Sequence, residues 1–206
     1  MVFSRLSSFE ENSVIRDRIT QSIRGRNENY EQAARRFLEI LFKTEANDKT
    51  IVHSTERYSS DGKTKLGVGG LADRVKGAAT CMIIAASIGA RFQLDWRTPF
   101  KVTDFFNIPE DVIFKADKGN LSTHNWIDTS LSREIRTSLC GEDIGEIFAD
   151  ATNIINCNTL SLEILSNPAN VKMSEFAHLK RVFWVGTIFR ILEYDPGVDE
   201  MRSIFS

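Results

Sequence analysis

The spacing of hydrophobic residues predicts a strand–helix–strand unit in the middle of the chain. A short apolar segment, 66–68, runs into a glycine-rich turn, and a run typical of a helix extends from residue 71 to about 88. Residues 91–96 then alternate strictly between polar and apolar side chains, which is the pattern of a β-strand. The helix carries many alanines on its apolar side, so we expect that side to pack closely against a sheet. The polar face of the second strand is expected to border a cleft or to be incompletely covered.

Helical patterns precede this unit, and shorter elements follow it. Residues 7–26 and a segment starting at Asn29 have helical spacing, and the second has an apolar face: Ala33, Ala34, Phe37, Leu38, Leu41 and Phe42. Further along, the pattern predicts strands at 112–114 and around 154–155, and a short helix at 160–165. Residues 115–146 are predicted to be mostly loops, with one short helix near 130–139. A long, largely buried helix is predicted from near Ser174 to 192.

The alternation of strands and helices predicts an α/β domain with a mainly parallel, Rossmann-like sheet flanked by helices. We divide the chain into an N-terminal helical arm (1–50), the α/β domain (51–195) and a segment (196–206) that we expect to begin a linker to a further, C-terminal domain not contained in this sequence. The chain has 206 residues, of which 42% are hydrophobic, so it can form one sizeable core or two small ones.

Composition narrows the class of protein. The formal net charge of −2 argues against a general nucleic-acid-binding protein, which is usually basic. No run reaches the ~18 apolar residues of a membrane-spanning helix, and no signal peptide is apparent. The cysteines, Cys81, Cys140 and Cys157, are odd in number and form no Cys-x-x-Cys motif. Reduced thiols and a cytoplasmic location are therefore expected.

The central unit contains the candidate ligand site. A helix N-terminus offers unpaired N–H groups and positive partial charge to an anion, and glycine lets a ligand approach the backbone. In parallel sheets, ligands bind at the carboxyl ends of the strands, so the start of the helix and the end of the next strand are expected to converge on one crevice. Arg74 and Lys76 add positive charge there. Alternatively, the glycines serve geometry alone, Asp73 complements the helix dipole and Arg74 pairs with a surface carboxylate. The predicted site residues are Gly69, Gly70, Leu71, Ala72, Asp73, Arg74, Asp95, Trp96 and Arg97.

One interpretation of this site is a dinucleotide-binding fold. Gly67-x-Gly69-x-x-Ala72 matches the Gly-x-Gly-x-x-Gly/Ala fingerprint, and Asp95 then takes the place of the acidic residue that binds a ribose. Three features argue against it. Few apolar residues precede Gly67, Asp73 places a carboxylate where a pyrophosphate would bind, and Trp96 and Arg97 have no role in that scheme. An NAD-binding domain of an oxidoreductase remains the alternative hypothesis.

Two segments together carry a resemblance to a known family. Gly-Gly-Leu-Ala-Asp-Arg (69–74), the alanine-rich helix after it, and Arg-Phe-Gln-Leu-Asp-Trp-Arg (91–97) resemble the N-terminal half of fucosyltransferases of the nodulation-protein and peptide-O-fucosyltransferase superfamily. The resemblance covers about 35 residues, 65–100. One position departs from the family pattern, because the third glycine of the usual loop is Ala72 here.

The resemblance implies a GT-B glycosyltransferase, in which two Rossmann-like domains face each other across a cleft. The N-terminal domain mainly holds the acceptor glycan, and its glycine loop borders the donor, GDP-fucose. By this resemblance, residues 69–74 line the donor side, and Asp73 and Arg74 are the candidates for a catalytic role. Asp95, Trp96 and Arg97 shape the acceptor side or brace the loop. No metal cofactor is implied, because electrostatic stabilisation of the departing diphosphate is sufficient.

The donor motif of that family, His-x-Arg, is absent, because the histidines stand in His53-Ser-Thr, His124-Asn-Trp and His178-Leu-Lys. The sequence is therefore expected to represent the acceptor-side half, binding donor weakly and not turning over by itself. His124 and Trp126, predicted in a polar loop, are weaker candidates for contact with a sugar. No group of residues has metal-ligand spacing. A third hypothesis is a non-catalytic binding domain. The acceptor, the linkage and the oligomeric state are not predicted.

Overall fold

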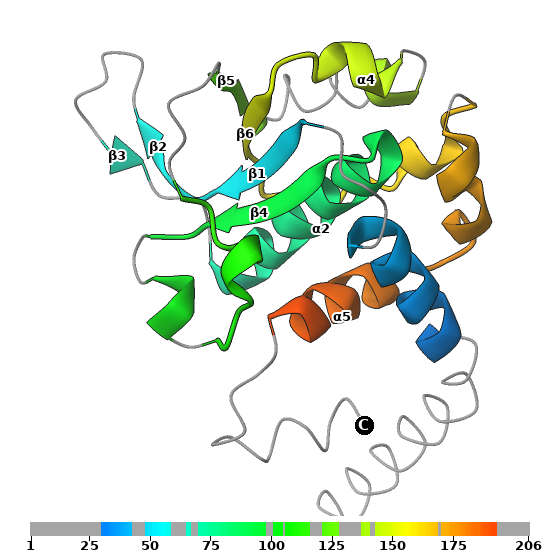
Figure 1. Cartoon of the computed structure of the whole chain (residues 1–206), viewed down its shortest axis with the longest axis horizontal. Coiled ribbons are helices and arrows are strands. Elements are labelled where there is room, and N and C mark those ends of the chain that lie inside the picture. The colour runs from blue at the N-terminus through cyan, green and yellow to red at the C-terminus, as the bar shows by residue number, and fades with distance from the viewer. Residues whose placement is uncertain are drawn as a thin grey trace, which may run out of the picture. The chain divides into compact units, whose positions relative to one another are not determined.

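The computed structural model describes residues 30–42, 48–58, 65–66, 70–97, 101–104, 106–115, 121–127, 137–140, 143–168 and 170–192 (Figure 1). Residues from Phe37 onward belong to one compact unit, separate from the preceding residues, and the fold below is that of this larger unit. The helix predicted at 7–26, glycines 67 and 69, and the segment 196–206 lie outside the described residues.

A parallel four-stranded sheet forms the centre of the fold (Figure 1). Its order is β4 (Arg91–Asp95), β1 (Thr50–Ser54), β6 (Thr152–Asn156) and β5 (Leu121–Asn125). Each neighbouring pair is parallel, and Ile113 extends the sheet beyond β4 through a parallel bridge to Leu94. The predicted α/β class with a Rossmann-like parallel sheet is confirmed.

The strand that leads toward the central helix is not the predicted one. Lys65–Leu66 (β3) pairs antiparallel with Arg57–Tyr58 (β2) in a separate two-stranded hairpin, and β1 is the sheet strand before the helix. β1 pairs with β4 on one side and β6 on the other. Its only apolar residues are Ile51 and Val52, so pairing on both edges, and not its own pattern, makes it a strand.

The central helix, α2 (Leu71–Ile88), has the predicted bounds, and Gly89 ends it in the left-handed conformation at φ 68°. Apart from Lys76, it is buried on all sides from Arg74 to Ala86, whereas the prediction placed one side against the sheet. The reason is visible in Figure 1, where α2 lies between the sheet and α5 (Arg181–Ile191), and it contacts both. A helix that is apolar all round is expected in such a position.

The last α-helix, α5, starts later than the helix predicted from near Ser174. Val171–Phe176 forms a 3-10 helix (η4), and the α-helix begins at Arg181. Val182 lies within the helix that was predicted to be largely buried, but it is 72% exposed. Phe37, in the helical segment 30–42, packs edge-on against Phe176 and Trp184 with ring centroids 5.7 and 5.0 Å away. On the predicted apolar face of that segment Phe42 is exposed.

The remaining elements are short. They are η1 (Val102–Asp104), η2 (Glu110–Val112), α4 (Ile144–Ile147) and η3 (Glu163–Ser166). β5 and α4 lie in the region that was predicted to be mostly loops. The pattern did not predict β5, because its sequence Leu-Ser-Thr-His-Asn does not alternate between apolar and polar residues. Its pairing with β6 makes it a strand. Within the described ranges, no helix has the length and apolar character needed to cross a bilayer.

Candidate ligand site at the carboxyl edge of the sheet

The carboxyl ends of β1, β4 and β6 lie at one edge of the sheet, beside the start of α2. The chain runs from β1 through α2 to β4, which lies beside β1 on one edge, whereas β6 lies beside β1 on its other edge. The topological switch point, where folds of this kind bind ligands, therefore lies between β1 and β6. α2 is pressed against this edge at Gly77. A Cβ there would lie 1.8 Å from the carbonyl oxygen of Cys157 and 2.6 Å from Nε2 of His53.

His53, near the end of β1, is fully buried and braces this edge. The indole N–H of Trp96 donates to its Nδ1 at 2.7 Å, and its Nε2 lies 2.9 Å from the carbonyl oxygen of Cys157. An indole nitrogen only donates and a carbonyl only accepts, so these partners require the neutral tautomer with the proton on Nε2. Both ring nitrogens are therefore engaged, and His53 is not available as a general base.

Burial agrees with the neutral state of His53. The pKa of His53 is lowered to about 4, chiefly by desolvation; the hydrogen bond to Cys157 raises it in part, and the charge of Arg74 lowers it. Arg74, in the first turns of α2, is itself 4% exposed, and desolvation lowers the pKa of its guanidinium. The edge therefore carries a buried cation close to a histidine that stays uncharged.

Asp95 and Arg97 form a charged pair at this edge. The carboxylate of Asp95 is 8% exposed and accepts from the Ser54 hydroxyl at 3.1 Å and from Nε of Arg97 at 2.5 Å. The side chain of Arg97 is 49% exposed. The terminal nitrogens of Arg97 have no partner among the described residues. Because the hydrogen bond from Nε to Asp95 fixes the planar guanidinium group, these nitrogens are donors with a set orientation.

The start of α2 differs from the predicted glycine turn. Gly70 caps the helix at φ −76° and ψ 179°, an extended conformation open to any residue, and nothing lies within 4 Å of a Cβ there. Leu71 and Ala72 are exposed, and Asp73 pairs with Lys76 at 2.6 Å. The special conformation expected of the glycines is thus not needed at Gly70, and Gly69 is outside the described residues.

The structure adds residues that sequence reasoning missed. Asn156, at the end of β6, donates from Nδ2 to the carbonyl oxygens of Ser54 and Glu56 at 2.9 and 3.0 Å. Asn125, its partner in register on β5, has a buried Oδ1 without a hydrogen-bond partner among the described residues. The sequence did contain a signal: Asn156 directly follows the apolar pair Ile154-Ile155, and Ser54 follows Ile51-Val52 with only His53 between them.

His124 and Trp126 lie on and just after β5, and not in a loop as predicted. His124 Nε2 is 3.1 Å from Oδ1 of Asn153. Trp126 is 5% exposed, and its ring lies 5.7 Å from that of Phe148. An indole buried in this way offers little face for stacking on a sugar.

The described part of the chain offers neither a metal-binding cluster nor a reactive thiol at Cys81. No group of three or more His, Cys, Asp or Glu residues there has an arrangement suited to a metal ion. Cys81 and Cys157 are buried free thiols, and burial raises the pKa of Cys81, which keeps it protonated and unreactive.

Comparison with known proteins finds no matching family model, no matching curated protein and no matching solved structure. Function must therefore be argued from the chemistry of the site.

Proposed function

We propose that this α/β unit forms one wall of a nucleotide-sugar-dependent glycosyltransferase site, and that its reaction is fucosyl transfer from GDP-fucose to a glycan. In that reaction the bond between the anomeric carbon and the diphosphate breaks, and a bond to an acceptor hydroxyl forms as the hydroxyl loses its proton. The protein's main task is to stabilise the negative charge on the departing diphosphate.

The arrangement of Asp95 and Arg97 is the observation that carries the proposal. Arginine binds phosphate oxygens through two parallel N–H donors, and it does so best when its planar group is held in place. Asp95 holds Arg97 at Nε, and Ser54 holds Asp95. The terminal nitrogens of Arg97 are then presented at the edge where α/β sheets bind ligands.

Arg74 adds a second positive charge at the same edge. It lies in the segment 69–74 that carries the family resemblance, and its charge acts on His53 at the end of β1. Residues 91–97, the other segment of the resemblance, end at Arg97. The two segments that resemble the fucosyltransferases thus meet at one edge of the sheet, which supports a shared ligand.

The dinucleotide hypothesis receives less support from the geometry. The fingerprint requires a glycine turn directly after a sheet strand. Here the hairpin of β2 and β3 lies between β1 and α2. The carboxylate of Asp95, which should bind a ribose in that scheme, already accepts hydrogen bonds from Ser54 and Arg97.

An NMR titration tests the proposal, because it also detects weak binding. We expect GDP-fucose and GDP to shift the amide signals of residues 70–74 and 95–97, with saturation, and NAD⁺ to leave them unchanged. Arg97→Gln should weaken GDP binding by about tenfold or more, since a charge-assisted contact is lost. Arg91→Gln, an exposed arginine at the other end of the same strand, is the matched control.

Two outcomes would overturn the assignment: saturable binding of NAD⁺ in place of GDP, or equal GDP affinity in wild type and Arg97→Gln. A transfer assay with GDP-fucose and oligosaccharide acceptors then separates an active enzyme from a binding domain. In the binding domain, the nucleotide titration stays positive while no fucosylated product forms.

A further inference from the structure

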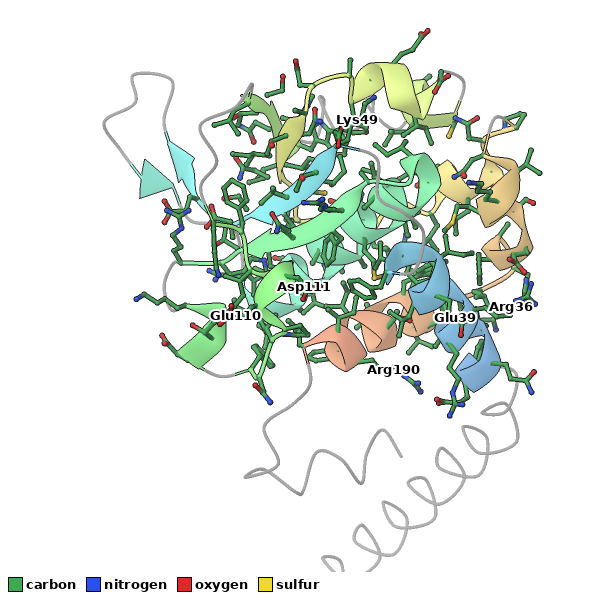
Figure 2. The ribbon with its side chains drawn as sticks, in the orientation of Figure 1. Arg36, Glu39, Lys49, Glu110, Asp111 and Arg190 are labelled. Atoms are coloured by element: carbon green, nitrogen blue, oxygen red, sulfur yellow. The ribbon has the colours of Figure 1, made fainter. Side chains whose placement is uncertain are left out.

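A polar cavity of about 260 Å³ lies at the opposite, amino edge of the sheet. It is formed where the chain enters β1 at Lys49, where α2 ends at Ser87 and Ile88, and where α4 begins. Figure 2 shows Lys49 at the start of β1, next to α4. The cavity is therefore separate from the carboxyl-edge site and independent of the proposed function.

One wall of the cavity contains an unsatisfied acceptor. Asn170 is 5% exposed, and its Nδ2 donates to the hydroxyl of Ser87 at 2.7 Å and to the carbonyl of Ile164 at 3.3 Å. Since the Ile164 carbonyl accepts only, the amide orientation is determined, and Oδ1 is the other atom. That Oδ1 is buried and has no hydrogen-bond partner among the described residues, so it requires a donor.

The charges around the cavity are of both signs. Lys49 supplies an ammonium, which donates to the Gly145 carbonyl at 3.0 Å, and Asp143 supplies a carboxylate, whose Oδ1 accepts from the Gly145 amide at 2.7 Å. The carbonyl groups at the carboxyl end of α2 add negative partial charge, and no basic residue in the last turn offsets it. Ile88 and Ile144 contribute apolar surface.

We propose that this cavity binds a small zwitterion, a free α-amino acid with an apolar side chain. Its ammonium group donates to Oδ1 of Asn170 and to the carboxylate of Asp143, and its carboxylate faces the ammonium of Lys49. Its side chain lies against Ile88 and Ile144. A liquid water occupies about 30 Å³, so a cavity of about 260 Å³ has room for an amino acid.

The test is an NMR titration of the whole chain with L-leucine. We expect saturable shifts in the amide signals of Lys49, Ser87 and Gly145, with those of residues 95–97 unchanged. N-acetyl-L-leucine lacks the ammonium and L-leucinamide lacks the carboxylate, so each should bind about tenfold more weakly or worse. No saturable shift with L-leucine, or equal affinity for the three compounds, overturns the proposal and leaves water as the partner of Asn170.

Variants test the same point from the protein side. Lys49→Gln keeps an N–H donor and Asp143→Asn keeps an acceptor for Gly145, and each removes one charge. Both should weaken L-leucine binding by about tenfold. Lys172→Gln, an exposed lysine on η4, is the matched control and should bind like wild type. Unchanged affinity in both charge variants would contradict the proposal, and the series of leucine derivatives decides it even if a variant fails to fold.

Discussion

The two edges of the sheet differ in how most of their buried polar groups are satisfied. At the carboxyl edge, the polar side chains of His53, Ser54 and Asn156 are engaged with protein partners, while Oδ1 of Asn125 has no hydrogen-bond partner among the described residues. At the amino edge, a cavity remains, and Oδ1 of Asn170 is left without a partner among the described residues. Polar groups that form hydrogen bonds with one another have no remaining capacity to bind a ligand, so they do not indicate where a ligand binds. The useful groups are those that such hydrogen bonding orients or leaves unpaired: Arg97 and Asn125 at the carboxyl edge and Asn170 at the amino edge.

The difference arises from how α2 meets each edge. Near its start, Gly77 allows the helix to touch His53 and Cys157, so no space remains between helix and sheet there. Near its end, Ser87 contacts Asn170 through a single hydrogen bond, and the chain turns away at Gly89. The helix is therefore closely packed against the sheet near Gly77, and the cavity lies beside its other end, near Ser87.

The largest effect is expected from Gly77→Ala. The new Cβ would lie 1.8 Å from a backbone oxygen, which cannot move aside without displacing the end of β6. We expect a loss of more than about 3 kcal/mol in the free energy of unfolding, measured by urea denaturation.

Gly186→Ala is the control, because this glycine also lies inside a helix and nothing is within 4 Å of its Cβ position. Alanine has the higher helix propensity, so the change should stabilise the protein by up to about 1 kcal/mol. If both variants were equally stable, the close packing of α2 on the carboxyl edge would be wrong.

His53 predicts a pH dependence of stability. Its pKa is about 4 in the folded protein against 6.5 for an ordinary histidine, so the unfolded chain binds the extra proton between these values. The contribution is fully present above pH 6.5 and is lost as the pH falls toward 4, at about 1.4 kcal/mol per pH unit and about 3 kcal/mol in total. Urea denaturation across this range measures the slope.

In His53→Gln the same hydrogen-bonding pattern can form without a titrating group, because a glutamine amide both accepts and donates. The stability of this variant should therefore fall less steeply between pH 6.5 and 4 than that of the wild type. Parallel slopes in the two proteins would show that His53 is not held neutral, and the brace at the carboxyl edge would need revision.

A smaller effect is expected from Thr80→Val, which tests whether the close contact of α2 extends beyond Gly77. The buried hydroxyl of Thr80 donates to the Thr159 carbonyl at 2.7 Å and accepts from the Ser161 amide at 2.9 Å. Valine has the same shape but leaves both backbone groups without this partner, at a cost of about 2 kcal/mol.

Thr187→Val provides the comparison within α5. The Thr187 hydroxyl donates to the Phe183 carbonyl of its own helix, so its loss leaves that helix and its neighbours in place. We expect a cost below about 1 kcal/mol in thermal or urea unfolding. Equal costs for the two threonines would argue that Thr80 does not join α2 to the segment after β6.

Local pattern was sufficient where an element carries its own periodicity. The bounds of α2 and the alternation of β4 follow from apolar spacing, and the two segments carrying Asp95, Arg97 and Arg74 were expected at one edge because parallel strands end together. The strands β1 and β5 were not predictable in this way. β1 has two apolar residues and β5 has none in its interior, so each depends on the hydrogen bonds of its neighbours.

The sequence by itself therefore determined the α/β class, the central helix and the charged residues at the end of β4, since these depend on short-range spacing. The tertiary structure alone decided that His53 is neutral, that Asp95 orients Arg97, and that Asn170 faces an amino-edge cavity. Each of these depends on contacts between segments far apart in the chain, such as His53 with Cys157 or Asn170 with Ser87. Burial and hydrogen-bond partners at such contacts set the protonation and orientation of a side chain, and no local pattern records them.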